Sequence, residues 1–290
     1  MADSAFTIQY RQEFIAGFEV GQSRLRSTVI TEAQIKGNQA VFLTADSGGA
    51  IAQTRGLNGL IPSRTDNLNQ FTATLIEYHD LVQRTSFNLF ASQGDGKRIM
   101  QETSMKVINR TIDLDILSKL ATTTNATTVQ TANLGLVTRV LTKMGNNAVP
   151  IEETDNMFFV VTPAFMGYLF QTKEFTNAFY VDVKVFTNPN MGIGATSSQS
   201  GTGTVRMMRW AGFNWIQSAL ITGIGTTNEL CYAFHRSSMG HAVNTGEITA
   251  IADYNRRQDY SWARTSVFMG SQLLQNKGVF QVPHDGSALS

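Results

Sequence analysis

Residues 97–121 read KRIMQETSMKVINRTIDLDILSKLA, a stretch without glycine or proline. Its main apolar side chains recur every three or four positions, at Met105, Ile108, Ile112, Ile116 and Leu120. This spacing places them on one face of an α-helix. At ~1.5 Å per residue the helix would be ~38 Å long, whereas the average helix of a globular protein has about three turns. The stretch therefore predicts one unusually long helix.

Upstream of this helix, residues 28–35 and 40–44 are strand-like, and the Lys-Gly-Asn turn at 36–38 predicts a hairpin between them. Residues 46–70 are then rich in Gly, Ser, Asn, Thr and Arg, before an alternating strand over 71–78. A loop of this length is uncommon inside a compact domain and is usually functional or disordered. The same stretch also fits a long two-stranded hairpin that stands away from the body.

The N-terminal residues 1–27 are interpreted as a short helix or arm, with Asp3 or Ser4 able to cap a helix start. Phe6, Phe14 and Phe18 give it more aromatic surface than so short a segment can bury on itself. We therefore expect this arm to pack on another part of the assembly.

Downstream of the long helix, a polar linker over 122–130 leads into a second unit of mixed helices and strands. Thr162 followed by Pro163 is typical of a helix start. Gly and Ser dominate residues 188–204, which predicts an exposed, mobile loop. The other predicted elements are a helix at 132–144 and strands at 157–161, 180–186, 205–219, 229–234 and within 247–282, the last ended by Pro283.

The composition excludes several classes of protein. With 42% hydrophobic and 10% aromatic residues the chain can build a core, which argues against disorder. The net charge is +1 and no block of Lys and Arg occurs, which argues against a sequence-reading DNA binder. No apolar run approaches the ~20 residues of a membrane span, and no signal peptide is recognised, so we expect folding in the cytosol and no membrane partner.

The candidate chemical motifs do not add up to an active site. The single cysteine, Cys231, excludes an internal disulfide or a multi-thiolate metal site, and its apolar neighbours favour a core position. The Gly pairs at 192–194 and 201–203 lack the third glycine of a dinucleotide fingerprint. The four histidines show no zinc-type helical pair, and we interpret His235 and His241 as polar residues with satisfied hydrogen bonds.

Acidic and basic pairs also favour structural roles. Asp113 and Asp115 stand two residues apart and so do not share a helix face, and adjacent Glu152 and Glu153 are typical of a solvated loop. Arg256 and Arg257 lie near Asp253 and Asp259, which favours ion pairing or an interface over a phosphate site. We predict no catalytic, cofactor-binding or metal-ligating residues, and hence no enzyme.

Several short stretches of sequence, together with the predicted order of helices and strands, match the pattern of a known family. The sequence leads from QSRLR at 22–26 into Thr28 and Val29, and later contains WAGFNW at 210–215 and CYAFHRSSMG at 231–240, then DYSW at 259–262. In this order and these stretches the chain resembles the major capsid proteins of tailed bacteriophages. Their Hong Kong phage coat fold is shared with encapsulins and herpesvirus shells. The resemblance covers essentially the whole chain.

The resemblance implies an α+β capsid fold with a peripheral domain, an axial domain, an extended loop that lies over a neighbouring subunit, and an N-terminal arm. The long helix becomes the spine helix of the peripheral domain. The implied divisions are arm 1–27, peripheral strands 28–45, extended loop 46–70, peripheral domain 71–130, axial domain 131–227, and return to peripheral and C-terminal strands 228–290.

The implied function is a structural coat subunit that assembles as pentamers and hexamers into an icosahedral shell around double-stranded DNA. Implied partners are further copies of the chain, a separate scaffolding protein, a portal protein, DNA held without sequence preference, and a decoration protein in some shells. Assembly would occur in the bacterial cytoplasm, and no cofactor is implied. The candidate inter-subunit contacts are Arg55, Arg64, Arg256, Arg257, Phe6, Phe14 and Phe18.

Two alternatives remain open: an encapsulin-like compartment that holds a protein cargo, and a small-molecule-binding or enzyme domain whose site is not recognised. Some shells of the resembled family are crosslinked through a lysine in the extended loop. Residues 46–70 contain Arg55 and Arg64 but no lysine. We therefore expect no such isopeptide bond, so denaturing gels of mature particles should show no covalent ladder.

Overall fold

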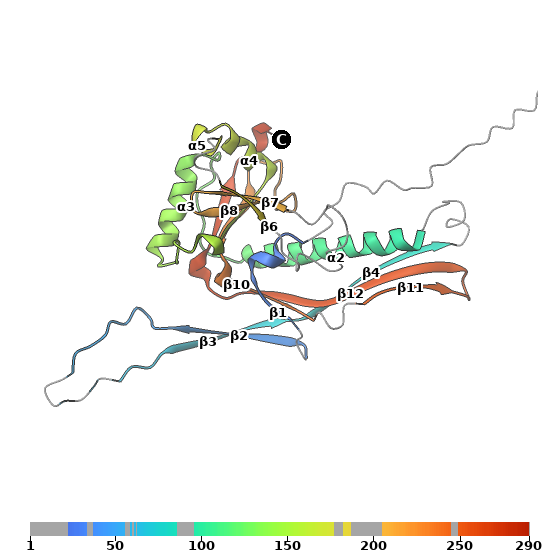
Figure 1. Cartoon of the computed structure of the whole chain (residues 1–290), viewed down its shortest axis with the longest axis horizontal. Helices are drawn as coiled ribbons and strands as arrows, with labels where there is room; N and C mark the ends of the chain where they lie inside the picture. The colour runs from blue at the N-terminus through green and yellow to red at the C-terminus, as the bar shows by residue number, and fades with distance from the viewer. Residues whose placement is uncertain are drawn as a thin grey trace, which may run out of the picture.

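The computed structural model describes residues 23–33, 37–55, 59, 61, 63–85, 96–176, 182–186, 205–244 and 249–289. Within these ranges one unit consists of a long sheet with a helix along it, and a second is a six-stranded sheet with helices around it. A two-stranded hairpin projects from the body (Figure 1). The expected α+β class is confirmed. Phe6, Phe14, Phe18 and the glycine-rich loop at 188–204 lie outside the described residues.

The long helix predicted at 97–121 is α2, Gly96–Leu120. Ile108, Ile112, Ile116 and Leu120 on its apolar face are at most 1% exposed. At its end the Thr122 hydroxyl donates to the Lys119 carbonyl at 2.7 Å, and the Thr123 N–H donates to the Leu120 carbonyl at 3.2 Å. These bonds satisfy carbonyls that a helix end leaves without partners.

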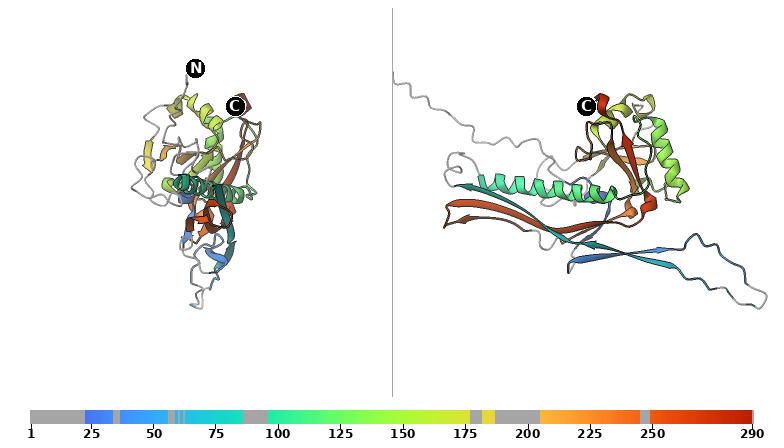
Figure 2. Two further views of the ribbon diagram at one scale, coloured as in Figure 1. Left: turned by 90° about the vertical axis from the view of Figure 1, so that its right-hand side faces the viewer. Right: turned by 180° about the vertical axis from the view of Figure 1, so that it is seen from behind.

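Helix α2 lies along a sheet whose central strand is β12, Tyr260–Leu273 (Figures 1 and 2). Strand β4, Ile76–Thr85, runs antiparallel along one side of β12. On the other side β11, Thr249–Asn255, and β10, Met239–Val243, pair with successive parts of β12. Strand β1, Ile30–Ala33, pairs in parallel with β10.

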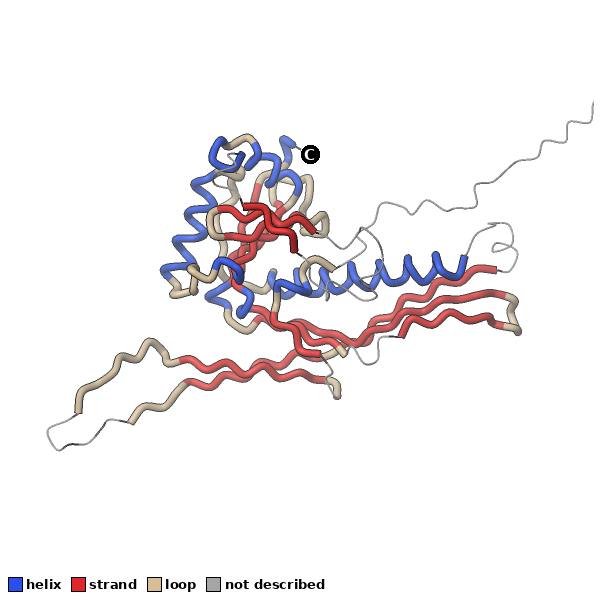
Figure 3. Tube along the Cα trace, viewed as in Figure 1, coloured by secondary structure: helices blue, strands red, loops and turns tan. Residues whose placement is uncertain are grey.

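The projecting hairpin consists of β2, Gln39–Asp46, and β3, Asn67–Thr74, paired antiparallel from Gln39 with Thr74 to Asp46 with Asn67 (Figure 3). The hairpin that stands away from the body, one of the two options for residues 46–70, therefore forms at the base of this stretch. Phe42 packs onto β10, where a Cβ at Gly240 would come within 2.8 Å of its ring. Only glycine permits this close approach.

The prediction of a hairpin between 28–35 and 40–44 was wrong. Strand β1 pairs with β10, and β2 pairs with β3. The reason is burial. Ala40 and Phe42 of β2 pair with Ala73 and Phe71 of β3, and this pairing buries the side chains of Ala40, Phe42 and Ala73. Gly37, at φ 104°, lies between two strands that do not pair with each other.

The second sheet brings together strands from distant parts of the chain. Its strand order is β13-β9-β5-β8-β7-β6, with β5 parallel to β8 and antiparallel to β9. The strands are β5 Met157–Val161, β6 Asp182–Phe186, β7 Val205–Trp210, β8 Phe213–Gln217, β9 Glu229–His235 and β13 Val279–His284. Because β9 and β13 belong to this sheet, the expected boundary between 131–227 and 228–290 separates strands that are hydrogen-bonded together.

Pro283 does not end the last strand as expected, because β13 includes it and continues to His284. Pro283 pairs with Leu230 of β9, and its own strand, β13, forms one edge of the described sheet. An edge strand tolerates a residue without an N–H group.

Helices α3, Leu134–Asn146, α4, Pro163–Phe170, and α5, Lys173–Thr176, surround this sheet (Figure 1). Asn133 caps α3 by accepting the Leu136 N–H at 2.8 Å. Thr162 caps α4 by accepting the Phe165 N–H at 3.2 Å, and Pro163 stands first in the helix as predicted. Short 3₁₀ turns complete the described structure: η1 Arg26–Thr28, η2 Thr154–Asn156, η3 Arg236–Ser238, η5 Asn276–Gly278 and η6 Ser287–Leu289.

The core of this unit is aromatic. Phe159 of β5 is fully buried and stacks on Trp215 with ring centroids 4.6 Å apart. Phe165 and Phe213 each lie 5.4 Å from Phe159. Offset and edge contacts of this kind stabilise a core beyond the area they bury.

Candidate functional site: the sheet junction and the projecting hairpin

Among the described residues, two adjacent turns lead directly from a strand of one large sheet to a strand of the other. Turn η3 joins β9 to β10, and η5 joins β12 to β13. The two crossings are bonded together, since the N–H of Leu274, which precedes η5, donates to the carbonyl of Ser238 in η3 at 2.8 Å. A Cβ at Gly278 would lie 2.0 Å from the Ser238 hydroxyl oxygen, so this contact requires glycine. The junction is therefore closely packed.

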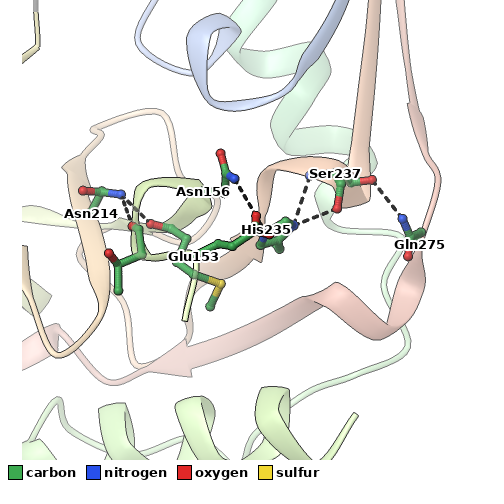
Figure 4. Close-up of polar contacts among 8 residues, drawn as sticks. Glu153, Asn156, Asn214, His235, Ser237 and Gln275 are labelled. Atoms are coloured by element: carbon green, nitrogen blue, oxygen red, sulfur yellow. Dashed lines mark hydrogen bonds and ion pairs between the residues drawn. The ribbon is translucent and has the colours of Figure 1, made fainter. Parts of the chain in front are cut away.

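Ser237, His235 and Glu153 at this junction are the residue types of a nucleophile triad (Figure 4). The Ser237 hydroxyl lies 2.7 Å from His235 Nδ1, and His235 Nε2 lies 3.6 Å from the Glu153 carboxylate, beyond hydrogen-bond distance. The Ser237 backbone N–H, a natural oxyanion donor, instead donates to His235 Nδ1 at 3.3 Å. His235 thus caps η3, and the geometry favours a structural role.

Burial lowers the pKa of His235, although nearby Glu153 works in the opposite direction. Glu153 itself accepts a hydrogen bond from the Asn156 side chain at 2.8 Å. The Gln275 side chain donates to the Ser237 carbonyl at 3.4 Å, and so links the second crossing to the first (Figure 4).

The acidic pair of α2 binds two different parts of the protein. Asp113 accepts hydrogen bonds from the segment at 23–25, whereas Asp115 accepts the Ser271 hydroxyl of β12 at 2.6 Å. His241 of β10 lies 2.9 Å from the same hydroxyl through Nδ1. Because the hydroxyl proton of Ser271 points to Asp115, His241 must carry its own proton on Nδ1. This proton order is the reverse of a Ser nucleophile activated by His.

The remaining sequence candidates also occupy structural positions. Cys231 is fully buried, and burial raises the pKa of its thiol to about 12, so it is an inert core residue as predicted. His235 and His241 are satisfied only in part, contrary to the prediction, since the Nε2 of each is buried with no hydrogen-bond partner among the described residues. Those residues contain no group of three or more His, Cys, Asp or Glu side chains placed to hold a metal ion.

The predicted contact arginines lie far apart. Arg55 and Arg64 are exposed between β2 and β3, where Arg64 forms an ion pair with Asp66 at 2.5 Å. Arg256 and Arg257 are exposed in the turn between β11 and β12, at the opposite end of the molecule (Figure 1). One subunit therefore does not bring these pairs together.

The sequence reasoning missed the apolar outer face of the hairpin. Leu43 and Leu68 are 80% and 81% exposed, and Val41 on the same face is 47% exposed. Ile51 and Ile61, beyond the paired strands, are 88% and 71% exposed. The alternation of residues 40–43 carried this signal, because Ala40 and Phe42 face the body while Val41 and Leu43 face away.

Family comparison identifies the class of protein to which this fold belongs. A family model described as phage capsid protein matches residues 2–285, and the chain belongs to this family. No curated protein matches the sequence. Among the described residues, no helix is long and apolar enough to cross a membrane.

Solved capsids show the same fold at low sequence identity. A Mycobacterium phage Che8 structure aligns with TM-score 0.66 at 13% identity, over 97% of this chain and 98% of that one. The capsid of cyanophage P-SCSP1u gives 0.67 at 11% identity over 97% and 93%. A native gene transfer agent (GTA) capsid gives 0.68 at 12% identity over 98% and 96%. The family match and the shared fold confirm the resemblance to tailed-phage major capsid proteins noted in the sequence.

Proposed function

We propose that this capsid protein assembles as pentamers and hexamers into a closed icosahedral shell around double-stranded DNA, with the β2–β3 hairpin as the arm that holds neighbouring subunits. Shell formation needs subunit elements that reach beyond their own core. The outer face of the hairpin, defined by Val41, Leu43 and Leu68, supports this role because it is apolar and points away from its own body.

The outer face can supply a useful share of the contact energy. Burying an exposed leucine side chain contributes ~2 kcal/mol. Leu43 and Leu68 on a neighbour would then contribute ~4 kcal/mol per contact, before the cost of association. In a closed shell every subunit makes such contacts with several neighbours, so weak contacts add up to a stable lattice.

The other partners follow from the same proposal. A separate scaffolding protein would guide assembly in the bacterial cytoplasm, a portal protein would occupy one vertex, and a decoration protein could bind the finished shell. DNA would be held without sequence preference, since the chain is nearly neutral at +1. No catalytic step is part of this role. The exposed arginines Arg55, Arg64, Arg256 and Arg257 remain proposed contacts between subunits.

The test is a double substitution on the outer face, Leu43→Ser with Leu68→Ser. We expect the chain to stay folded but to give no particles in negative-stain electron microscopy and sedimentation, because both side chains are exposed in the single subunit. Gln70→Ser is the matched control, since Gln70 lies opposite Leu43 on the same face and is polar. Wild-type particle yield from the double variant would refute the proposal that the β2–β3 hairpin holds neighbouring subunits. Particles with protein cargo and no nucleic acid would indicate an encapsulin-like compartment.

A further inference from the structure

Residues 23–29, here called the strap, lie between α2 and the six-stranded sheet. Leu25 and Val29 of the strap are fully buried in the main core, and η1 occupies its middle. Ser23 and Thr28 are also fully buried, although both are polar. A buried polar segment needs defined hydrogen-bond partners, and those partners come from both units of the molecule.

On one side the partner is Asp113 of α2. Its carboxylate accepts the Ser23 hydroxyl at 2.6 Å, the Arg24 N–H at 3.1 Å and the Leu25 N–H at 3.1 Å. Asp113 is only 2% exposed. Burial raises the pKa of its carboxyl, and the three donors work against that rise. A helix side chain here caps the backbone of a distant segment.

On the other side the partner is the six-stranded sheet. The Arg24 guanidinium donates through Nη1 to the carbonyl of Gln217 at 2.6 Å. Gln217 is the last residue of β8. Consecutive strap residues are therefore bound to α2 through backbone N–H groups and to β8 through a side chain, so the strap is hydrogen-bonded to both units within their shared core.

Asp115 holds α2 from the opposite direction. Residues two positions apart in an α-helix, such as Asp113 and Asp115, are separated by ~200° around its axis. Asp113 therefore faces the strap, whereas Asp115 faces Ser271 of β12. Helix α2 is therefore held between the strap and the sheet of β12. Replacing Asp113 removes the contact with the strap, whereas replacing Asp115 removes the contact with β12.

We propose that residues 23–25 are a tie that fixes the six-stranded sheet relative to α2, with Asp113 as the anchor on the helix and Arg24 as the link to β8. Without the tie, the described chain passes between the units at η3, at η5 and through the linker at 121–133. Thr123 and Asn125 of the linker bind Asn276 of η5, so the three crossings adjoin one another and form a natural hinge axis. The tie acts at a separate position, on Gln217 of β8, and so restrains rotation about that axis.

Two measurements on the full-length, unassembled chain test the tie, and neither requires shell formation. The first is hydrogen exchange at the Arg24 and Leu25 amides. We expect Asp113→Asn to accelerate it at least tenfold at one or both amides, because Oδ2 accepts the Arg24 N–H and Oδ1 the Leu25 N–H, and asparagine keeps only one of these two oxygens. Asp115→Asn is the matched control, a half-buried aspartate on the same helix that binds Ser271 of β12 instead of the strap, and should leave these two amides at the wild-type rate.

The second measurement is the distance between spin labels on Gln258, in the turn between β11 and β12, and Thr138 on α3, both of which are exposed. The native Cys231 is fully buried and does not compete for labelling. Asp113→Asn should broaden the distance distribution. Arg24→Leu, which keeps both backbone bonds to Asp113, should broaden it too and serves alone if Asp113→Asn does not fold. An unchanged distribution in Arg24→Leu, or unchanged exchange in folded Asp113→Asn, would overturn the tie.

Discussion

The six-stranded sheet and the β2–β3 hairpin use apolar side chains in opposite ways. In the sheet, all five residues of β5 are buried, and Phe159 is surrounded by other aromatic rings. In the hairpin, alternate residues of β2 are buried while Val41 and Leu43 between them are exposed. The first region completes its core within one chain. The second leaves apolar side chains exposed on its outer face, the face that we propose contacts a neighbouring subunit.

The largest effect on the free energy of unfolding is expected for a substitution in the core of the six-stranded sheet. Phe159→Ala should lower the free energy of unfolding by ~3–5 kcal/mol, because it leaves a cavity among Trp215, Phe165 and Phe213. Leu43→Ala in the hairpin should change it by less than ~0.5 kcal/mol. Urea unfolding of the unassembled chain measures both. Similar losses at the two positions would mean that the outer face of the hairpin already supports the subunit's own core.

A medium effect is expected at the junction, which holds the sheet units together. Gly278→Ala should cost ~1–3 kcal/mol, since the new methyl group overlaps the Ser238 hydroxyl. Adding Ser238→Ala should recover part of the loss, because the nearest remaining Ser238 atom, Cβ, lies 3.3 Å away. Thermal unfolding of the single and double variants makes the comparison. Equal melting temperatures would show that the two crossings separate easily.

The smallest effect concerns pH. Burial, with a contribution from the charge of Arg26, lowers the pKa of His241 to about 3, whereas an unfolded histidine titrates near 6.5. The unfolded chain therefore binds this proton first, and stability present above pH 6.5 is lost as the pH falls toward about 3. The loss at pH 5.5 is ~1.4 kcal/mol.

His241→Gln should flatten this part of the stability profile, measured by urea unfolding between pH 7.5 and 5.5. Asp113 and Asp115 act in the opposite direction, because burial raises the pKa of both carboxyls. The contribution of Asp113, which binds the strap, is common to both chains and cancels in the comparison. Asp115 shares the Ser271 hydroxyl with His241, so the comparison is made with Asp115→Asn in both chains. His79→Gln is the control, since His79 is exposed and pairs with Glu77 at the surface. Parallel profiles for His241→Gln and wild type would contradict the prediction.

Local sequence patterns predicted the elements whose causes are local. The spacing of Ile108, Ile112 and Ile116 predicted α2 to within one residue at each end, and Thr162 with Pro163 predicted the start of α4. Strand pairing was predicted poorly, because β1 and β10 meet only in the folded chain. The same limit applies to the site. The spacing of Asp113 and Asp115 showed that they face different ways, but not that the partners are Ser23 and Ser271.

The parallel pair of β1 and β10 also sets the time at which the protein can fold. Ile30 pairs with Gly240, 210 positions later in the chain. At a synthesis rate of ~5–20 residues per second, β1 waits roughly 10 to 40 s for its partner. Strand β13, at the edge of the six-stranded sheet, is made later still. Both large sheets therefore stay incomplete until strands from the last fifth of the sequence, β12 and β13, have left the ribosome.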